Sequence, residues 1–171
     1  YARQIITLTH PHIGNTGITP EDNESPRIWA SGLVVKDLSE IVSNWRSKMS
    51  LAEFLVKNKT VAISGIDTRQ LTSVLRETGS LKGAILSGEN IGADEIERAV
   101  NSAREFSGLV GVDLAREVTA AQPALWNEGP WDIKSGFTKS DGGKYKVVAL
   151  DFGVKRNILR LLVGKGCSVN V

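Results

Sequence analysis

The stretch that decides the fold is VVALDFGVKRNILRLLVGKGCSVNV, residues 147–171. Residues 147–150 form a continuous apolar run, which is typical of a strand that is covered on both faces. Residues 151–153 predict a turn, residues 155–163 an amphipathic helix, and Val169 the start of a second strand. This order predicts one β-α-β unit, which is the opening of a parallel-sheet domain. Because one such unit cannot form a stable sheet, we expect the chain to be a fragment that stops within this domain.

The segment before this unit, residues 120–146, has a different composition. It contains Pro123, Pro130, Trp126 and Trp131, and a polar run over residues 139–144. Prolines and polar turn residues favour an interdomain connection. The two tryptophans indicate that the connection packs against other parts of the protein.

The first part of the chain alternates short apolar runs with helical patterns, which is typical of an α/β domain. Ser50 with Glu53 forms a capping box, and Asp67 with Gln70 opens a second helix that Gly79 ends. The spacing of Leu38, Ile41, Val42 and Trp45 predicts another helix, capped by Asp37. The remaining expected elements are strands at residues 5–9, 32–35, 61–63 and 83–86 and a helix over residues 94–105.

Composition excludes several classes of protein. Of 171 residues, 41% are hydrophobic and 23% charged, which favours a folded core over disorder. The formal net charge of +2 is too small to indicate nucleic-acid binding, and no apolar run is long enough for a membrane span. The single cysteine, Cys167, cannot form an internal disulfide, so we expect a cytoplasmic location.

Metal binding and thiol catalysis have weak support. His10 and His12 are too few for a zinc site, and we expect no metal. Cys167 follows a predicted helix and lies far in sequence from both histidines, so we expect it to be buried and structural.

Two charged turns are the candidate contact sites. Asp67 and Arg69 lie at a predicted helix start, where an anion could bind, although a helix cap and a local ion pair explain them as well. Lys155, Arg156 and Asn157 follow Asp151 at the carboxyl end of a predicted strand, where open α/β sheets bind ligands and partners. Simple solvent exposure is the alternative for these cations.

Two nucleotide-binding classes are disfavoured by spacing. Asp151-Phe152-Gly153 matches a kinase tripeptide, but the phosphate loop and catalytic loop of kinases are missing from the sequence. The turn after residue 150 also departs from the Gly-x-Gly-x-x-Gly spacing that dinucleotide binding requires.

Several motifs together resemble one family, the small, glutamine-hydrolysing subunit of carbamoyl-phosphate synthetase. They occur in family order across almost the whole chain. The matching segments are Pro11-His12-Ile13-Gly14-Asn15, Gly65-Ile66-Asp67-Thr68-Arg69, Leu71-Thr72, Leu75-Arg76-Glu77, Gly111-Val112-Asp113-Leu114-Ala115, Glu117-Val118-Thr119, and Asp151-Phe152-Gly153 with Lys155 and Asn157-Ile158-Leu159-Arg160.

The resemblance implies an α/β fold in three parts. Residues 1–119 are expected to form a layered β/β/α N-terminal domain without its first segment, and residues 120–146 the connector. Residues 147–171 are expected to begin a class I glutamine amidotransferase domain. The implied activity is hydrolysis of glutamine and supply of ammonia to a large subunit, a ligase of arginine and pyrimidine biosynthesis. ATP and Mg²⁺ are expected on that large subunit, and no cofactor on this chain.

This sequence departs from the family pattern at the catalytic centre. The family's Cys-Leu-Gly-His-like elbow, His-x-Glu pair and Gly-Pro-Gly-Asp segment do not occur here. No catalytic or glutamine-binding residue can therefore be carried over, and we expect the chain alone to be inactive. Asp67, Arg69, Asp151, Lys155, Arg156 and Asn157 are the candidate interdomain or intersubunit contacts. The alternative is a non-catalytic docking module. In either case, exposed apolar surface and an unpaired sheet edge predict self-association.

Overall fold

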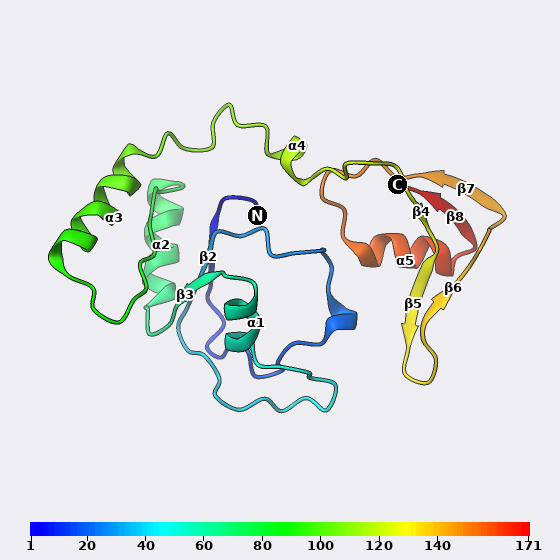
Figure 1. The fold of residues 1–171 in the computed structure, drawn as a ribbon, viewed down its shortest axis with the longest axis horizontal. Coiled ribbons are helices and arrows are strands. Elements are labelled where there is room, and N and C mark those ends of the chain that lie inside the picture. Colours follow the sequence, from blue (N-terminus) through cyan, green and yellow to red (C-terminus); the bar gives the residue numbers. More distant parts are fainter. The chain divides into compact units, whose positions relative to one another are not determined.

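The computed structural model describes residues 1–171, which separate into two compact units (Figure 1). The first unit comprises residues 1–19 and 27–112. The second comprises residues 20–26 and 113–171, so a short segment near the start of the chain packs with its last third. No helix is long and apolar enough to cross a membrane.

A three-stranded parallel sheet organises the first unit. Its order is β1 (Ile5–Leu8), β2 (Gly32–Val35) and β3 (Val61–Ile63). The central strand β2 carries the buried side chains, Val34 and Val35. These three strands confirm the strands predicted from the apolar runs.

Helix α1 (Leu51–Lys57) begins at the predicted capping box. The Glu53 backbone N–H donates to the Ser50 hydroxyl at 3.2 Å, and the Ser50 backbone N–H donates to the Glu53 carboxylate at 2.7 Å. The Ser50 hydroxyl donates to the same carboxylate at 3.0 Å. Two of the amides that lack partners at the helix start are thereby satisfied.

The capping box gives a pH-dependent prediction. The hydrogen bond from the Ser50 backbone N–H, and to a smaller extent the one from its hydroxyl, hold the pKa of Glu53 below its ordinary value. Because the folded-state pKa is lowered, this contribution to stability is present above the unfolded-state pKa and is lost as the pH falls through the folded-state pKa.

We expect Ser50→Ala to raise the pKa of Glu53 only part of the way, because the stronger backbone bond remains. Loss of the cap should destabilise α1 by about 1 kcal/mol. NMR titration of the Glu53 side chain measures the pKa, and Ser73→Ala, at a serine of helix α2 (Thr68–Thr78), is the control. An unchanged pKa in Ser50→Ala would contradict the prediction.

Two further helices complete the first unit. Helix α2 (Thr68–Thr78) is capped by Asp67, and its end is marked by Gly79 at φ +82°, a backbone conformation that favours glycine. Helix α3 (Ala93–Glu105) covers the predicted range 94–105. Its apolar residues Ile96 and Val100 remain 53% and 41% exposed, so this helix buries little apolar area.

Two expected elements of the first unit are wrong. The chain after Asp37 forms no helix: its backbone pairs with residues 13–18, through bridges from Ile13 to Leu38 and from Ile18 to Met49. Those hydrogen bonds leave Ile41 and Trp45 about three-quarters exposed, so the helical spacing of the apolar residues reflected no buried face. Residues 83–86 form no strand either; Ile85 packs over Gly32 by its side chain instead.

The second unit contains the predicted β-α-β arrangement. Strands β7 (Tyr145–Val148) and β8 (Cys167–Asn170) are parallel, and helix α5 (Arg156–Gly164) connects them. Strand β4 (Leu125–Trp126) adds an antiparallel neighbour on the other side of β8. The unit also holds the 3₁₀ turn η1 (Pro20–Asp22) and helix α4 (Leu114–Val118).

The core of the second unit lies between α5 and β8. Its buried residues are Leu159, Val163, Cys167 and Val169, and Trp126 and Val147 are among the half-buried side chains packed against them. Val169 is 0% exposed. Cys167 is a free, buried cysteine, as its position after the helix predicted.

A hairpin of β5 (Glu128–Asp132) and β6 (Gly136–Lys139) lies within the segment expected to be the connector. The Asp132 carboxylate closes its turn by accepting from the backbone N–H groups of Lys134 at 2.9 Å and Ser135 at 3.2 Å. These bonds hold the pKa of Asp132 below its ordinary value. Segment 120–146 thus contains strands β4, β5 and β6 and the start of β7.

Candidate functional site

The turn between β7 and α5 is held by Asp151. Its Oδ1 accepts from the backbone N–H groups of Gly153 and Val154, both at 2.8 Å. Gly153 has φ +89°, so the turn needs a residue without a side-chain penalty in this conformation. The Asp151 carboxylate therefore acts within the turn, in the manner of an Asx turn.

Four of the predicted site residues meet at this turn. Lys155 occupies the N-cap position of α5, and Arg156 and Asn157 are the first helical residues. Lys155 and Asn157 are exposed, while Arg156 is half-buried. The structure thus brings Asp151, Lys155, Arg156 and Asn157 together at the carboxyl end of β7, which is the usual ligand- or partner-binding edge of an open α/β sheet.

The charges at this helix start are unfavourable in isolation. The first turn of an α-helix carries the positive end of the macrodipole, so Lys155 and Arg156 oppose it. The Lys155 side chain makes no cap hydrogen bond, and the first turn contains no acidic residue. An anionic group from elsewhere is therefore expected at this end of α5.

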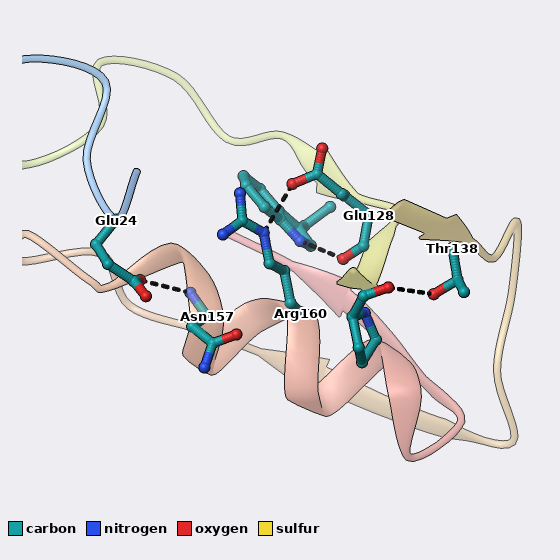
Figure 2. Close-up of polar contacts among 7 residues, drawn as sticks. Glu24, Glu128, Thr138, Asn157 and Arg160 are labelled. Carbon is teal, nitrogen blue, oxygen red and sulfur yellow. Dashed lines mark hydrogen bonds and ion pairs between the residues drawn. The ribbon is translucent and has the colours of Figure 1, made fainter. Parts of the chain in front are cut away.

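Glu24 supplies that group. Its carboxylate Oε2 accepts from the backbone N–H of Asn157 at 2.9 Å (Figure 2). Its backbone carbonyl accepts from the N–H of Arg156 at 3.2 Å. Sequence reasoning did not identify Glu24, because 133 positions separate it from Asn157 and no local pattern connects them.

A buried ion pair supports α5 further along. Arg160 Nε donates to Glu128 Oε1 at 2.9 Å, and the Arg160 side chain is 6% exposed (Figure 2). The guanidinium lies 4.3 Å from the centroid of the Phe137 ring. Both partners come from the β5–β6 hairpin, so this arginine fixes the hairpin against α5. The sequence signal for this ion pair was a charged residue, Arg160, directly after the apolar residue Leu159 in the helix.

The other two predicted site residues lie in the first unit, at the start of α2. Asp67 Oδ1 accepts from the backbone N–H of Gln70 at 3.0 Å, so this carboxylate acts as the helix cap. Thr68 is fully buried, and its hydroxyl has no hydrogen-bond partner. Arg69 is exposed. Of this turn, Arg69 is the group available for an intermolecular contact.

The histidines follow β1, at the same carboxyl end of the first sheet as Asp37 and Asp67. His10 Nδ1 donates to the His12 carbonyl at 2.9 Å, and His12 Nδ1 lies 3.3 Å from Asp37 Oδ2. His12 and Asp37 have side chains 65% and 60% exposed. A shallow hollow in the same unit follows one face of α3 and includes none of the predicted site residues; its lining residues are Arg98, Asn101, Ser102, Glu105 and Phe106.

Residues 1–85 match the family described as carbamoyl-phosphate synthase small chain, CPSase domain. Over the whole chain, the sequence is 55% identical to the carbamoyl phosphate synthase small chain of Pseudomonas aeruginosa and 54% identical to that of Thioalkalivibrio sulfidiphilus. It is 48% identical to the small chain of Xylella fastidiosa.

The alignments include all of this chain but only part of each relative. They span 45% of the Pseudomonas aeruginosa protein and 44% of the Thioalkalivibrio sulfidiphilus protein. The chain therefore spans less than half of the length of the curated relatives that it matches.

Proposed function

We propose that the chain is part of a member of the carbamoyl-phosphate synthase small-chain family. It acts as the part of the small subunit that supports the glutaminase site and contributes contact surface to the large subunit. The observation that carries this proposal is the 55% identity to the Pseudomonas aeruginosa small chain, in an alignment that includes both units of this chain. The alignment includes the turn after β7, which favours a shared role for that turn.

The activity proposed for the whole subunit is hydrolysis of glutamine with delivery of ammonia to the large subunit. Attack on the amide requires an activated thiolate, a general base and donors to the oxyanion. We assign none of these roles to Cys167, because it is buried in the apolar core. We assign no cofactor to this chain, and we propose that ATP and Mg²⁺ act on the large subunit, in a cytoplasmic ligase of arginine and pyrimidine biosynthesis.

The contact surface is proposed at the exposed members of the two charged turns. Asp67 and Asp151 are engaged by backbone amides of their own turns, and the Arg156 backbone is bonded to Glu24. Arg69 and Lys155 are exposed and stand beside these ordered carboxylates. Cations held on rigid turns favour contact with carboxylates of a partner domain or subunit.

We expect Lys155→Met in the gene product that contains this sequence to lower glutamine-dependent carbamoyl phosphate synthesis about tenfold, as loss of a desolvated charge contact would. Arg69→Met should act in the same direction. Synthesis from added ammonia should be unchanged, because that reaction bypasses the small subunit. Both activities are measured with the co-expressed large chain.

The matched control is Lys165→Met, which removes an exposed lysine at the opposite end of α5. It should leave both activities unchanged. Unchanged glutamine dependence and unchanged co-purification in both Lys155→Met and Arg69→Met would overturn the contact proposal. Capture of the large chain by a gene product that never stimulates glutamine use would instead favour a docking module.

A further inference from the structure

The start of α5 has no cap from its own sequence. The first N–H groups of an α-helix have no intrahelical partner and need acceptors from side chains, other backbone segments or water. Lysine at the N-cap position has no acceptor to offer, and here its backbone is extended, with φ −68° and ψ 128°. The N-cap residue Lys155 contributes one hydrogen bond to the helix start, in which its backbone carbonyl accepts from the Ile158 N–H at 3.0 Å.

The backbone N–H groups of Arg156 and Asn157, the first two residues of α5, both find their acceptors in Glu24. The Arg156 N–H donates to the Glu24 carbonyl. The Asn157 N–H donates to the Glu24 carboxylate (Figure 2). The carboxylate thereby takes the place that serine, aspartate or asparagine occupies in a local N-cap, which also bonds the second or third helical amide. It also places a negative charge at the positive end of the helix, beside the cations of Lys155 and Arg156.

We propose that Glu24 is the N-terminal cap of α5 and that segment 20–26, here called the capping segment, positions the turn that carries Asp151, Lys155 and Asn157. The capping segment packs with residues 113–171, although the residues before and after it belong to the other unit. Its own backbone is ordered by the 3₁₀ turn η1, in which the Asn23 N–H donates to the Pro20 carbonyl at 3.2 Å. Glu24 is therefore a positioning residue for the site turn.

The capping role stands on geometry alone, whereas its consequence for glutamine use rests on the proposed function. If the capping segment detached, α5 would begin with two cations and unpartnered amides, and its first turn would fray. The exposed Lys155 would then lose its fixed direction. We therefore expect detachment to reduce glutamine-dependent synthesis while leaving ammonia-dependent synthesis unchanged.

The test measures hydrogen exchange of the Arg156 and Asn157 amides in the gene product that contains this sequence. Glu24→Ala should lower the protection of Asn157 about fivefold, the effect of losing a typical N-cap. Arg156 should change less, because the residue 24 carbonyl remains. Glu24→Gln keeps an acceptor oxygen but removes the charge, so an intermediate loss is expected. Glu40→Ala, at an exposed glutamate of the first unit, is the control and should change neither amide.

A second substitution separates capping from a general structural role. Lys155→Asp places a local N-cap at α5 and should restore the protection of Asn157 in the Glu24→Ala background. Unchanged protection in Glu24→Ala, or loss of protection that Lys155→Asp does not restore, would overturn the proposal. If Glu24→Ala fails to fold, the same comparison is made in Glu24→Gln. Loss of protection with unchanged glutamine-dependent synthesis would overturn only the functional consequence, and it would leave the family-based proposal standing.

Discussion

Replacing Arg160 with alanine is expected to lower the free energy of unfolding of the second unit by about 3 kcal/mol. The substitution removes the Nε donor that lies 2.9 Å from Glu128 Oε1 and leaves that carboxylate without its ion-pair partner. It also removes the guanidinium packed over the Phe137 ring. Because the Glu128 side chain is 34% exposed, water can partly solvate the remaining carboxylate, which keeps the effect at the low end for a broken buried pair.

The measurement is hydrogen exchange of α5 and β8 amides as a function of urea, since it reports the stability of this unit by itself. Arg160→Lys should recover part of the loss, because a lysine keeps the charge but not the planar group over the ring. The double variant Arg160→Met with Glu128→Gln should be less destabilised than Arg160→Ala, because no unpaired charge remains. A loss below about 0.5 kcal/mol, the range of an exposed ion pair, would contradict the prediction.

Arg160 also shows where the sequence was informative and where it was not. The order of strand, turn, helix and strand over residues 147–171 follows from period and turn chemistry. The expected burial of the first strand on both faces is wrong, because β7 is an edge strand that ends at Val148, and Val148 and Leu150 are 74% and 75% exposed. A local pattern could not identify the partner of Arg160, because Glu128 lies on a hairpin 32 positions earlier. The hairpin itself was concealed by Pro130, a residue that strands tolerate only at edges or bulges. The ladder is indeed irregular between Glu128 and Trp131.

The helix expected after Asp37 failed for a different reason. Apolar residues at helical spacing predict a helix only when a face of that helix is buried. Here the backbone of residues 38–49 pairs with an earlier loop, and Ile41 and Trp45 remain exposed. Long-range hydrogen bonds outweighed a weak local preference, which a single sequence cannot reveal.

The candidate site also has a part that local sequence patterns predict and a part that depends on long-range contacts. Its turn was predictable, because charged residues directly after an apolar strand fall at a known edge of a parallel sheet. That Asp151 would be engaged by its own turn also follows from the glycine two residues later. The cap from Glu24 depends on a segment that joins the second unit from far away in sequence, so no local sequence pattern indicates it.

The largest single effect is expected at Val169, where aspartate should prevent the second unit from folding. Val169 is 0% exposed and packs in the apolar cluster with Leu159, Val163 and Cys167. No hydrogen-bond donor in that cluster other than the weak Cys167 thiol could stabilise a carboxylate. The cost of burying the group, in either charge state, is comparable to the entire stability of a typical domain, about 5–15 kcal/mol.

Asn170→Asp provides the matched control, because it introduces the same side chain at the next position of β8, where the residue is exposed. It should leave the exchange protection of α5 and β8 within about 0.5 kcal/mol of the parent. Val169→Thr gives a graded variant that still folds: it keeps the shape and replaces one methyl group with a hydroxyl, which should cost about 1–3 kcal/mol. Native-like protection of α5 and β8 in Val169→Asp would mean that Val169 does not lie in a core between this helix and this strand. In that case the β-α-β arrangement, and with it the placement of the Asp151–Asn157 turn, would have to be revised.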